Sequence, residues 1–385
     1  MAYEEKPQNV KELFRAHWLV WKWLGQVPHP KYPKLYKVYA IFLNTFFSLG
    51  YPLHLLLGLL YLVKLEDVLL NLTISVSVAI CSLKFFNIWR NLKKVQHLEQ
   101  IFDTLCARIN HPNDWRYYRE VSIPRAQKVL HLFYFVCVGT AVTSEFTLLI
   151  MCIATDWRLM YPAYFPFQPY ATTGNYLMAH LFQMFGLFVE LAENLVNDTY
   201  GAMCLALLAG HAHLLGRRVA SIGYDTKKSY EECNRDLINC IADHNLLFDC
   251  HRTIGEIIGV GMFFQIISAS LVLGCVIIYM VFYVDNIFEG VYYSIYLFGC
   301  AMEVFPTCYF GTHFEFEFEQ LTHMLFACNW MDQNRVFKRN LIICVEQSLQ
   351  KRNFRVGGMF HINLNTFFAT CKGAYSLLAV ALSMK

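Results

Sequence analysis

Acidic and amide side chains recur within an otherwise apolar segment from residue 176 to residue 208. Glu190, Glu193, Asn194, Asn197 and Asp198 are spaced by three and four positions, which places most of them on one face of a helix. Ionisable groups in such a segment are candidates for an ion or ligand path, because their burial is costly. The same spacing suits hydrogen bonding between packed helices, and we favour this second interpretation.

Single charges also occur in other apolar segments. Lys84 lies near one end of its segment, so we expect its ammonium group to reach the membrane surface while the aliphatic part stays in lipid. Glu145 is placed to line a cavity or to reach the interface. Glu303 is open to the same two interpretations as the acidic face around Glu190.

The chain has 14 cysteines and 14 histidines, which raises the question of metal or redox chemistry. His211 and His213 are two positions apart and therefore face different directions on a helix. His244 and His251 share a face, but the sequence contains no Cys-x-x-Cys and no His-Glu-x-x-His motif. We therefore predict no catalytic residues, no metal site and no cofactor, and we expect that the protein is not an enzyme. A membrane enzyme or transporter that uses His211 and His213 is kept as an alternative.

The last apolar segment is unusually polar for a membrane helix. Its polar residues are Asn363, Asn365, Thr366, Thr370, Lys372, Ser376 and Ser383. A helix of this kind suits a water-lined position, either within one subunit or around the axis of an oligomer. Ser376, Val380, Ser383 and Met384 fall in one helical sector, so we predict that they line a pore with a hydrophobic gate. Lys372 lies at the flank of this sector, and its spacing does not decide whether it faces the pore.

These polar groups are positioned by a chain with the composition of a membrane protein. Of 385 residues, 56% are hydrophobic and 16% are charged, against about 25% charged in a typical soluble domain. A membrane helix needs about 20 mostly apolar residues. Seven segments meet this need: Val38–Val63, Val68–Trp89, Val129–Ile153, Tyr176–Leu208, Ile258–Val284, Val291–Phe310 and Met359–Met384. We predict an all-α membrane protein with seven transmembrane helices.

The distribution of basic residues predicts the orientation. Of the 32 lysines and arginines, 27 lie before the first segment or in the second, fourth and sixth connections. By the positive-inside rule the N-terminus is cytoplasmic, and with seven spans the C-terminus is extracellular. This is the reverse of a G-protein-coupled receptor. A metabotropic receptor stays an alternative that a cytoplasmic C-terminus would favour.

The positions of the connections between the apolar segments divide the chain into four predicted parts. Residues 1–37 form a cytoplasmic N-terminal segment, within which Leu13–Leu24 is either an interfacial helix or a helix packed on the bundle. Residues 38–310 hold spans one to six with a ligand pocket in the outer half. Residues 311–358 form a cytoplasmic helical linker, part of a larger cytoplasmic helical layer, and residues 359–385 form the pore-lining last helix. The outer strip Tyr161–Tyr170, rich in proline and aromatic residues, is either a lid over a cavity or a lipid anchor.

Several motifs in the second half of the chain, together with this topology, resemble the insect odorant receptor family. The helix leading into span five contains Cys240-Ile-Ala-Asp-His-Asn-Leu-Leu-Phe-Asp, and Gly261-Met-Phe-Phe-Gln-Ile-Ile-Ser follows it. Phe326-Ala-Cys-Asn-Trp330 and Arg339-Asn-Leu resemble the link to span seven, and Phe367-Phe-Ala-Thr-Cys-Lys-Gly-Ala-Tyr375-Ser376 resembles the closing signature. The Gln-Phe that closes gustatory receptors is missing, although a gustatory-type chemoreceptor channel stays an alternative. The fourth connection is short, and in this respect the chain resembles a tuning subunit of the family.

The resemblance implies an odorant-binding subunit of a ligand-gated, non-selective cation channel that detects volatile chemicals. Its expected partner is the odorant receptor co-receptor, Orco, in a hetero-oligomer expected to be a tetramer in the plasma membrane of a sensory neuron dendrite. The other expected partners are a small volatile organic ligand and membrane lipids, and no nucleic acid is expected. The ligand pocket is expected between spans two, three, four and six. By position, its side chains are Val78, Ser144, Thr147, Met184, Phe188, Tyr293 and Tyr296.

Overall fold

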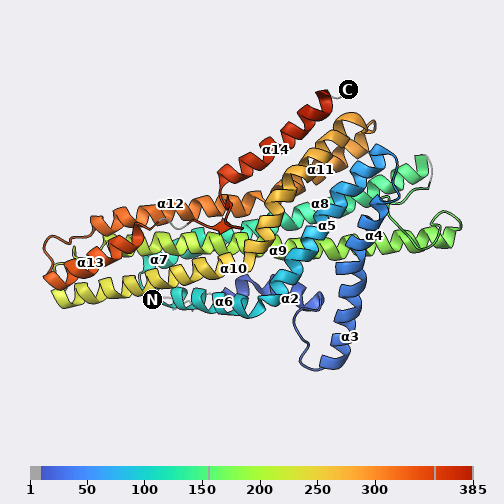
Figure 1. Ribbon diagram of the computed structural model, residues 1–385. Coiled ribbons are helices and arrows are strands. Elements are labelled where there is room, and N and C mark those ends of the chain that lie inside the picture. Colours follow the sequence, from blue (N-terminus) through green and yellow to red (C-terminus); the bar gives the residue numbers. More distant parts are fainter. Residues whose placement is uncertain (1–9, 155–156, 351–352, 384–385) are drawn as a thin grey trace.

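The computed structural model is almost entirely helical and describes residues 10–154, 157–350 and 353–383 (Figure 1). In chain order the elements are α1 Val10–Leu13, α2 Arg15–Trp23, α3 Pro33–Leu43, η1 Asn44–Leu49, α4 Gly50–Leu59, α5 Leu65–Arg90, α6 Leu92–Ala107, α7 Pro112–Tyr117, η2 Tyr118–Ser122, α8 Ile123–Ala154, α9 Thr173–Ala220, α10 Tyr230–Phe282, α11 Ile287–Met302, α12 Phe305–Ala327, α13 Arg335–Ser348, β1 Arg355–Val356, β2 Phe360–His361 and α14 Leu364–Ser383.

The seven predicted spans are all helical, with two differences in detail. Five helical runs of the described chain are long and apolar enough to cross a membrane: Pro33–Leu59, Leu65–Arg90, Pro112–Ile150, Tyr230–Phe282 and Leu364–Ser383. Span four is α9, whose acidic residues lower its hydropathy. Span six is divided between α11 and α12, because the helix is interrupted at Glu303 and Val304 and Pro306 lies in the first turn of α12.

The start of the last span differs from the prediction. We predicted a helix from Met359, but Met359 lies in the turn of a short antiparallel hairpin in which Arg355 faces His361 and Val356 faces Phe360. Gly357 and Gly358 have φ angles of 59° and 70°, a conformation that favours glycine and allows this tight turn. The helix α14 therefore begins only at Leu364.

A helical layer is present, as predicted, as a packed bundle of α6, α7, α12, α13 and the extensions of α9 and α10 (Figure 1), and it is called the cytoplasmic layer here after the side predicted for it. The helices α9 and α10 have 48 and 53 residues, far more than the roughly 20 needed to cross a bilayer. The largest cluster of buried apolar residues includes Leu98, Phe102, Leu237, Phe314 and Phe337 from this layer. The layer therefore shares one continuous core with the buried parts of the neighbouring spans.

The N-terminal helix α2 packs on the bundle and does not lie free at an interface. Phe14 and Trp21 are fully buried, and their rings lie 5.0 and 5.3 Å from the ring of Tyr200 on α9. The Nε2 atom of His17 lies 2.9 Å from the hydroxyl of Thr199. Of the two interpretations of Leu13–Leu24, the structure supports the packed helix.

Candidate ligand site

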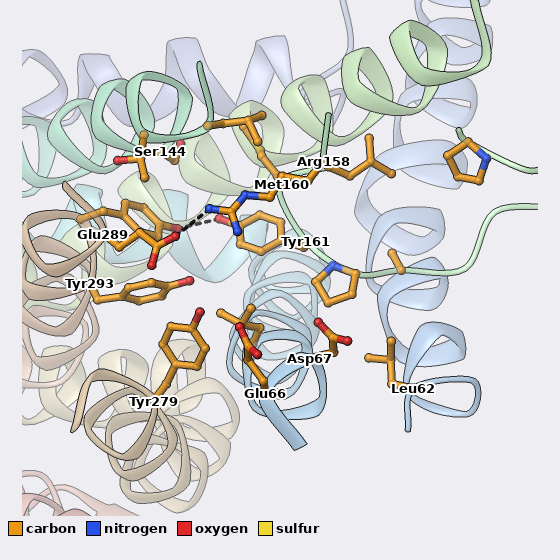
Figure 2. Close-up of a pocket in the computed structure, with 18 of the residues that line it drawn as sticks. Leu62, Glu66, Asp67, Ser144, Arg158, Met160, Tyr161, Tyr279, Glu289 and Tyr293 are labelled. Atoms are coloured by element: carbon orange, nitrogen blue, oxygen red, sulfur yellow. Dashed lines mark hydrogen bonds and ion pairs between the residues drawn. The ribbon is translucent and has the colours of Figure 1, made fainter. Parts of the chain in front are cut away.

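A cavity of about 440 Å³, here called the outer cavity, lies between α5, α8, α10, α11 and the loop from Arg158 to Tyr170 (Figure 2). Its volume is within the range of about 300–1,000 Å³ that is usual for small-molecule sites. Carboxylates and hydroxyls face it from several helices. These are Glu66 and Asp67 from α5, Ser144 and Thr147 from α8, Tyr279 from α10, and Glu289, Tyr292 and Tyr293 from α11.

The proline-rich strip covers this cavity as a lid. The Nη2 atom of Arg158 lies 2.7 Å from a carboxylate oxygen of Glu289, which ties the loop to α11 (Figure 2). The hydroxyls of Tyr161 and Tyr292 lie 2.8 Å apart and form a second link, and Gln183 of α9 donates a hydrogen bond to the carbonyl of Tyr161. Of the two interpretations of Tyr161–Tyr170, the structure therefore supports the lid.

A second, smaller cavity of about 60 Å³, here called the inner cavity, lies nearer to the cytoplasmic layer. Its walls come from α5, α8, α9 and α11, which are spans two, three, four and six. Most of the lining is apolar, with Ile74, Val78, Phe133, Leu187 and Tyr296 among its residues, and Glu190, Asn194 and Glu303 are its ionisable and amide members. The hydroxyl of Tyr296 donates to Ser77, 3.4 Å away.

Tyr161 lines both cavities and so forms part of the boundary between them. The side chain is 6% exposed, and its hydroxyl is held by Tyr292. A change in the rotamer of Tyr161 would join the two spaces, because it is a wall of each. The sequence analysis placed Tyr161 within a strip but gave no reason to single it out, since Tyr292 lies 131 positions away.

The structure divides the seven predicted ligand residues into three groups. Ser144, Thr147 and Tyr293 line the outer cavity, and Val78 and Tyr296 line the inner cavity.

Met184 and Phe188 line neither cavity, which corrects their predicted position. They lie on the outward face of α9, where Phe188 is 58% exposed and packs edge-to-face against Trp23. The physical reason is the rotation of α9. Glu190 and Glu193 turn inward, and at 100° per residue Phe188 is about 160° from Glu190 around the helix.

The polar face of α9 forms hydrogen bonds between helices, as the favoured interpretation predicted. The prediction that the ammonium group of Lys84 reaches the membrane surface is wrong. The group lies 2.6 Å from a carboxylate oxygen of Asp198 and 3.2 Å from the amide oxygen of Asn194. Asn194 and Gln265 in turn donate to the carboxylate of Glu303. The buried network therefore joins spans two, four, five and six.

The remaining candidate residues are accounted for by packing. His211 is buried beside Phe102 and Tyr118, whereas His213 lies 3.0 Å from a carboxylate oxygen of Glu317, so the two histidines face different partners as predicted. Glu145 lies 3.6 Å from the ring nitrogen of His180, on the face of α8 that meets α9.

The predicted pore residues lie on a helix at the edge of the single chain. Figure 1 shows α14 along the outside of the bundle, and only Thr370 and Ala374 of its residues are buried. Val380 is 57% exposed, and the hydroxyls of Ser376 and Ser383 bond to carbonyls of their own helix. Met384, the fourth predicted pore residue, lies outside the described residues.

The fold and the apolar helices define a multi-pass helical membrane protein with covered cavities between its helices. The profile of the family described as "7tm Odorant receptor" matches residues 64–375, and the chain belongs to this family of insect odorant receptors. It is an odorant-sensing receptor and not an enzyme.

Relatives and solved structures agree with this assignment. The chain is 32% identical to odorant receptor 59a of Drosophila melanogaster over 97% of this chain and 98% of that one. It is 31% identical to odorant receptor 33c of the same species over 97% of both chains. In fold it is similar to the insect olfactory receptor OR5 from Machilis hrabei, with a TM-score of 0.81, 13% identity and coverage of 98% and 99%. A structure of that receptor in complex with eugenol gives a TM-score of 0.75 at 14% identity, with coverage of 98% of both chains.

Proposed function

We propose that this chain is the odorant-binding subunit of a ligand-gated, non-selective cation channel. The observation that carries the proposal is the pair of cavities under one tethered lid, with Tyr161 between them. A volatile molecule enters the outer cavity, displaces Tyr161 and occupies the enlarged inner cavity. The inner walls are mostly apolar with a few hydroxyls, which suits a small, weakly polar ligand.

The contacts with the ligand are assigned by position. Val78 and Tyr296 touch it in the inner cavity, and Ser144, Thr147 and Tyr293 line its way in. The solved complex of the Machilis receptor with eugenol supports the chemical class, since eugenol is a small aromatic molecule with hydroxyl and ether oxygens.

The channel and its assembly are also part of the proposal. A helix as exposed as α14, with polar residues among its apolar ones, is expected to face other subunits around a water-filled axis. We place Ser376, Val380 and Ser383, with Met384, on the pore face. The other subunits are copies of the co-receptor, in a hetero-tetramer in the plasma membrane of a sensory dendrite. Residues 38–310 then sense the ligand, 311–358 transmit the change and 359–385 form the pore.

Expression in oocytes tests this function. Injection of this chain with the co-receptor should give cation currents in response to some members of a panel of esters, alcohols and aromatic volatiles. Oocytes that carry the co-receptor alone are the control for responses that do not need this chain. If cell-surface labelling shows the chain at the membrane and no volatile in a broad panel evokes a current, the proposal is wrong.

A second experiment tests the site. Val78→Trp fills the inner cavity and should abolish or reduce at least tenfold the response to every active volatile. Phe188→Trp also introduces a tryptophan, but on the outward face of α9. It should leave the responses within about twofold, as expected for an exposed substitution. Equal losses in the two variants would contradict the proposed site.

A further inference from the structure

Three side chains of the types that can bind metal ions meet beside the inner cavity. They are Cys81 of α5 and Glu190 and Glu193 of α9, and one ligand atom from each lies within 4.8 Å of the others. All three side chains are buried, with exposures of 0%, 2% and 0%. Spacing along the sequence could not indicate this group, because the thiol is more than one hundred positions from the carboxylates.

Each carboxylate has one oxygen held by a serine and one oxygen turned to the group. Ser48 donates to Oε1 of Glu193, and its Oε2 lies 3.8 Å from the sulfur of Cys81. Ser82 lies 3.4 Å from Oε1 of Glu190, and Oε2 of Glu190 is buried without a hydrogen-bond partner. Serines that fix the outer oxygen play the part that second-shell groups play in metal sites.

The spacing fits a tetrahedral ion. With Zn–S of about 2.3 Å and Zn–O of about 2.0 Å, the sulfur and oxygen on one edge of a tetrahedron are about 3.5 Å apart. The observed 3.8 Å between Cys81 and Glu193 needs only a small closure. Two carboxylates and one thiolate leave a fourth position for water.

The local charge also favours a cation. Glu190, Glu193 and Asp198 are buried in one region of the membrane half, half-buried Glu303 lines the inner cavity with Glu190, and Lys84 is paired with Asp198. Ionised carboxylates are costly to bury unless a cation or a proton compensates each of them. A divalent ion at Cys81 compensates both glutamates at once.

We propose that Cys81, Glu190 and Glu193 bind one zinc-like divalent cation. The thiol of Cys81 gives up its proton to water when the ion binds. Because Glu190 also lines the inner cavity, the bound ion fixes one wall of the space that we assign to the odorant. Metal binding itself does not depend on that assignment.

Metal content of the expressed protein tests the proposal. The full chain, produced in medium with added zinc and purified in detergent with a tag that lacks histidine, should retain about one zinc ion after washing with a chelator. Cys81→Ser and Glu193→Gln should each lower the retained zinc at least tenfold. Cys275→Ser is the matched control, since Cys275 is another buried membrane thiol but is not part of this group, and it should retain the ion.

The proposal is overturned if the wild-type chain retains no zinc, which would mean that the glutamates are protonated. It is also overturned if Cys81→Ser retains as much zinc as the wild type. If the variants do not fold, X-ray absorption at the zinc edge of the wild-type protein decides the question. One sulfur at about 2.3 Å with oxygen neighbours supports the site, and a shell without sulfur refutes it.

Discussion

One buried ion pair in the membrane half joins two different helices. Lys84 of α5 and Asp198 of α9 are both almost fully buried, and their charged atoms are 2.6 Å apart. Such a pair contributes little net stability compared with apolar residues, but loss of one member leaves an uncompensated charge in a medium of low dielectric constant. The pair therefore fixes how α5 and α9 fit together.

Lys84→Met should lower the free energy of unfolding by about 3–5 kcal/mol, because Asp198 then loses its cation. The double variant Lys84→Met with Asp198→Leu should regain most of this loss. Lys94→Met is the control, since Lys94 pairs with Glu256 at a surface where both side chains are about half exposed, and its cost should stay below about 1 kcal/mol. Unfolding in detergent, followed by the reaction of a dye with newly exposed cysteines, measures all three. Equal effects at positions 84 and 94 would contradict this account.

A buried carboxyl group makes the packing of the N-terminal helix depend on pH. Trp18 donates a hydrogen bond of 2.8 Å to Glu99 on α6, and burial raises the pKa of the Glu99 carboxyl from 4.5 to about 7. Between these two pH values the folded chain holds a proton that the unfolded chain has lost, so the free energy of unfolding falls as pH rises through this window.

Glu99→Gln should remove this component. Between pH 5 and pH 7 the wild type should lose about 2 kcal/mol of stability that the variant keeps, as the shift in pKa implies. The melting temperature of both proteins across this range is the measurement. Parallel pH profiles for the two proteins would show that Glu99 is not the group responsible.

At the scale of helices, periodicity predicted the elements well and their boundaries less well. The predicted span Val68–Trp89, for example, lies within α5. The break at Glu303 and Val304 was missed, because most of the segment is apolar and Pro306 alone is a weak local signal for a break. The contacts of Lys84 with Asp198 and of Tyr161 with Tyr292 were missed for a different reason: the partners lie more than one hundred positions apart, and helical spacing carries no information about such contacts.

The packing of α14 on α10 depends on small residues and leads to a prediction for the channel. A Cβ atom at Gly274 would lie 2.7 Å from Leu377 of α14, and Ser270 donates to the carbonyl of Thr370 in the same contact. Gly274→Val should displace α14 and lower the maximal current severalfold, while the odorant concentration for half response stays the same. Gly259→Val carries the same cost in helix propensity, but a Cβ there makes only an ordinary contact at 3.9 Å. Dose–response curves in oocytes distinguish the two; a change in half-response concentration alone would argue against this role of α14.

For the whole molecule, the basic residues predict one orientation in the membrane. With 27 of the 32 lysines and arginines on one side, a tag at the N-terminus should be reached by antibody only after the cells are permeabilised. A tag at the C-terminus should be reached in intact cells. A protected C-terminus would instead favour a metabotropic receptor and remove the basis for a pore built from an outward-ending α14.

The length of α9 has a mechanical consequence. At 1.5 Å per residue its 48 residues form a rod of about 72 Å. One part of this rod holds the lid through Gln183, and another reaches α12 in the cytoplasmic layer through His213. A lever of this length amplifies small movements: a tilt of about 3° about its midpoint shifts each end by about 2 Å. That shift is comparable to the helix displacements of about 1–2 Å by which other proteins change state, so a slight tilt of α9 at the lid would move the cytoplasmic layer by a full switching distance.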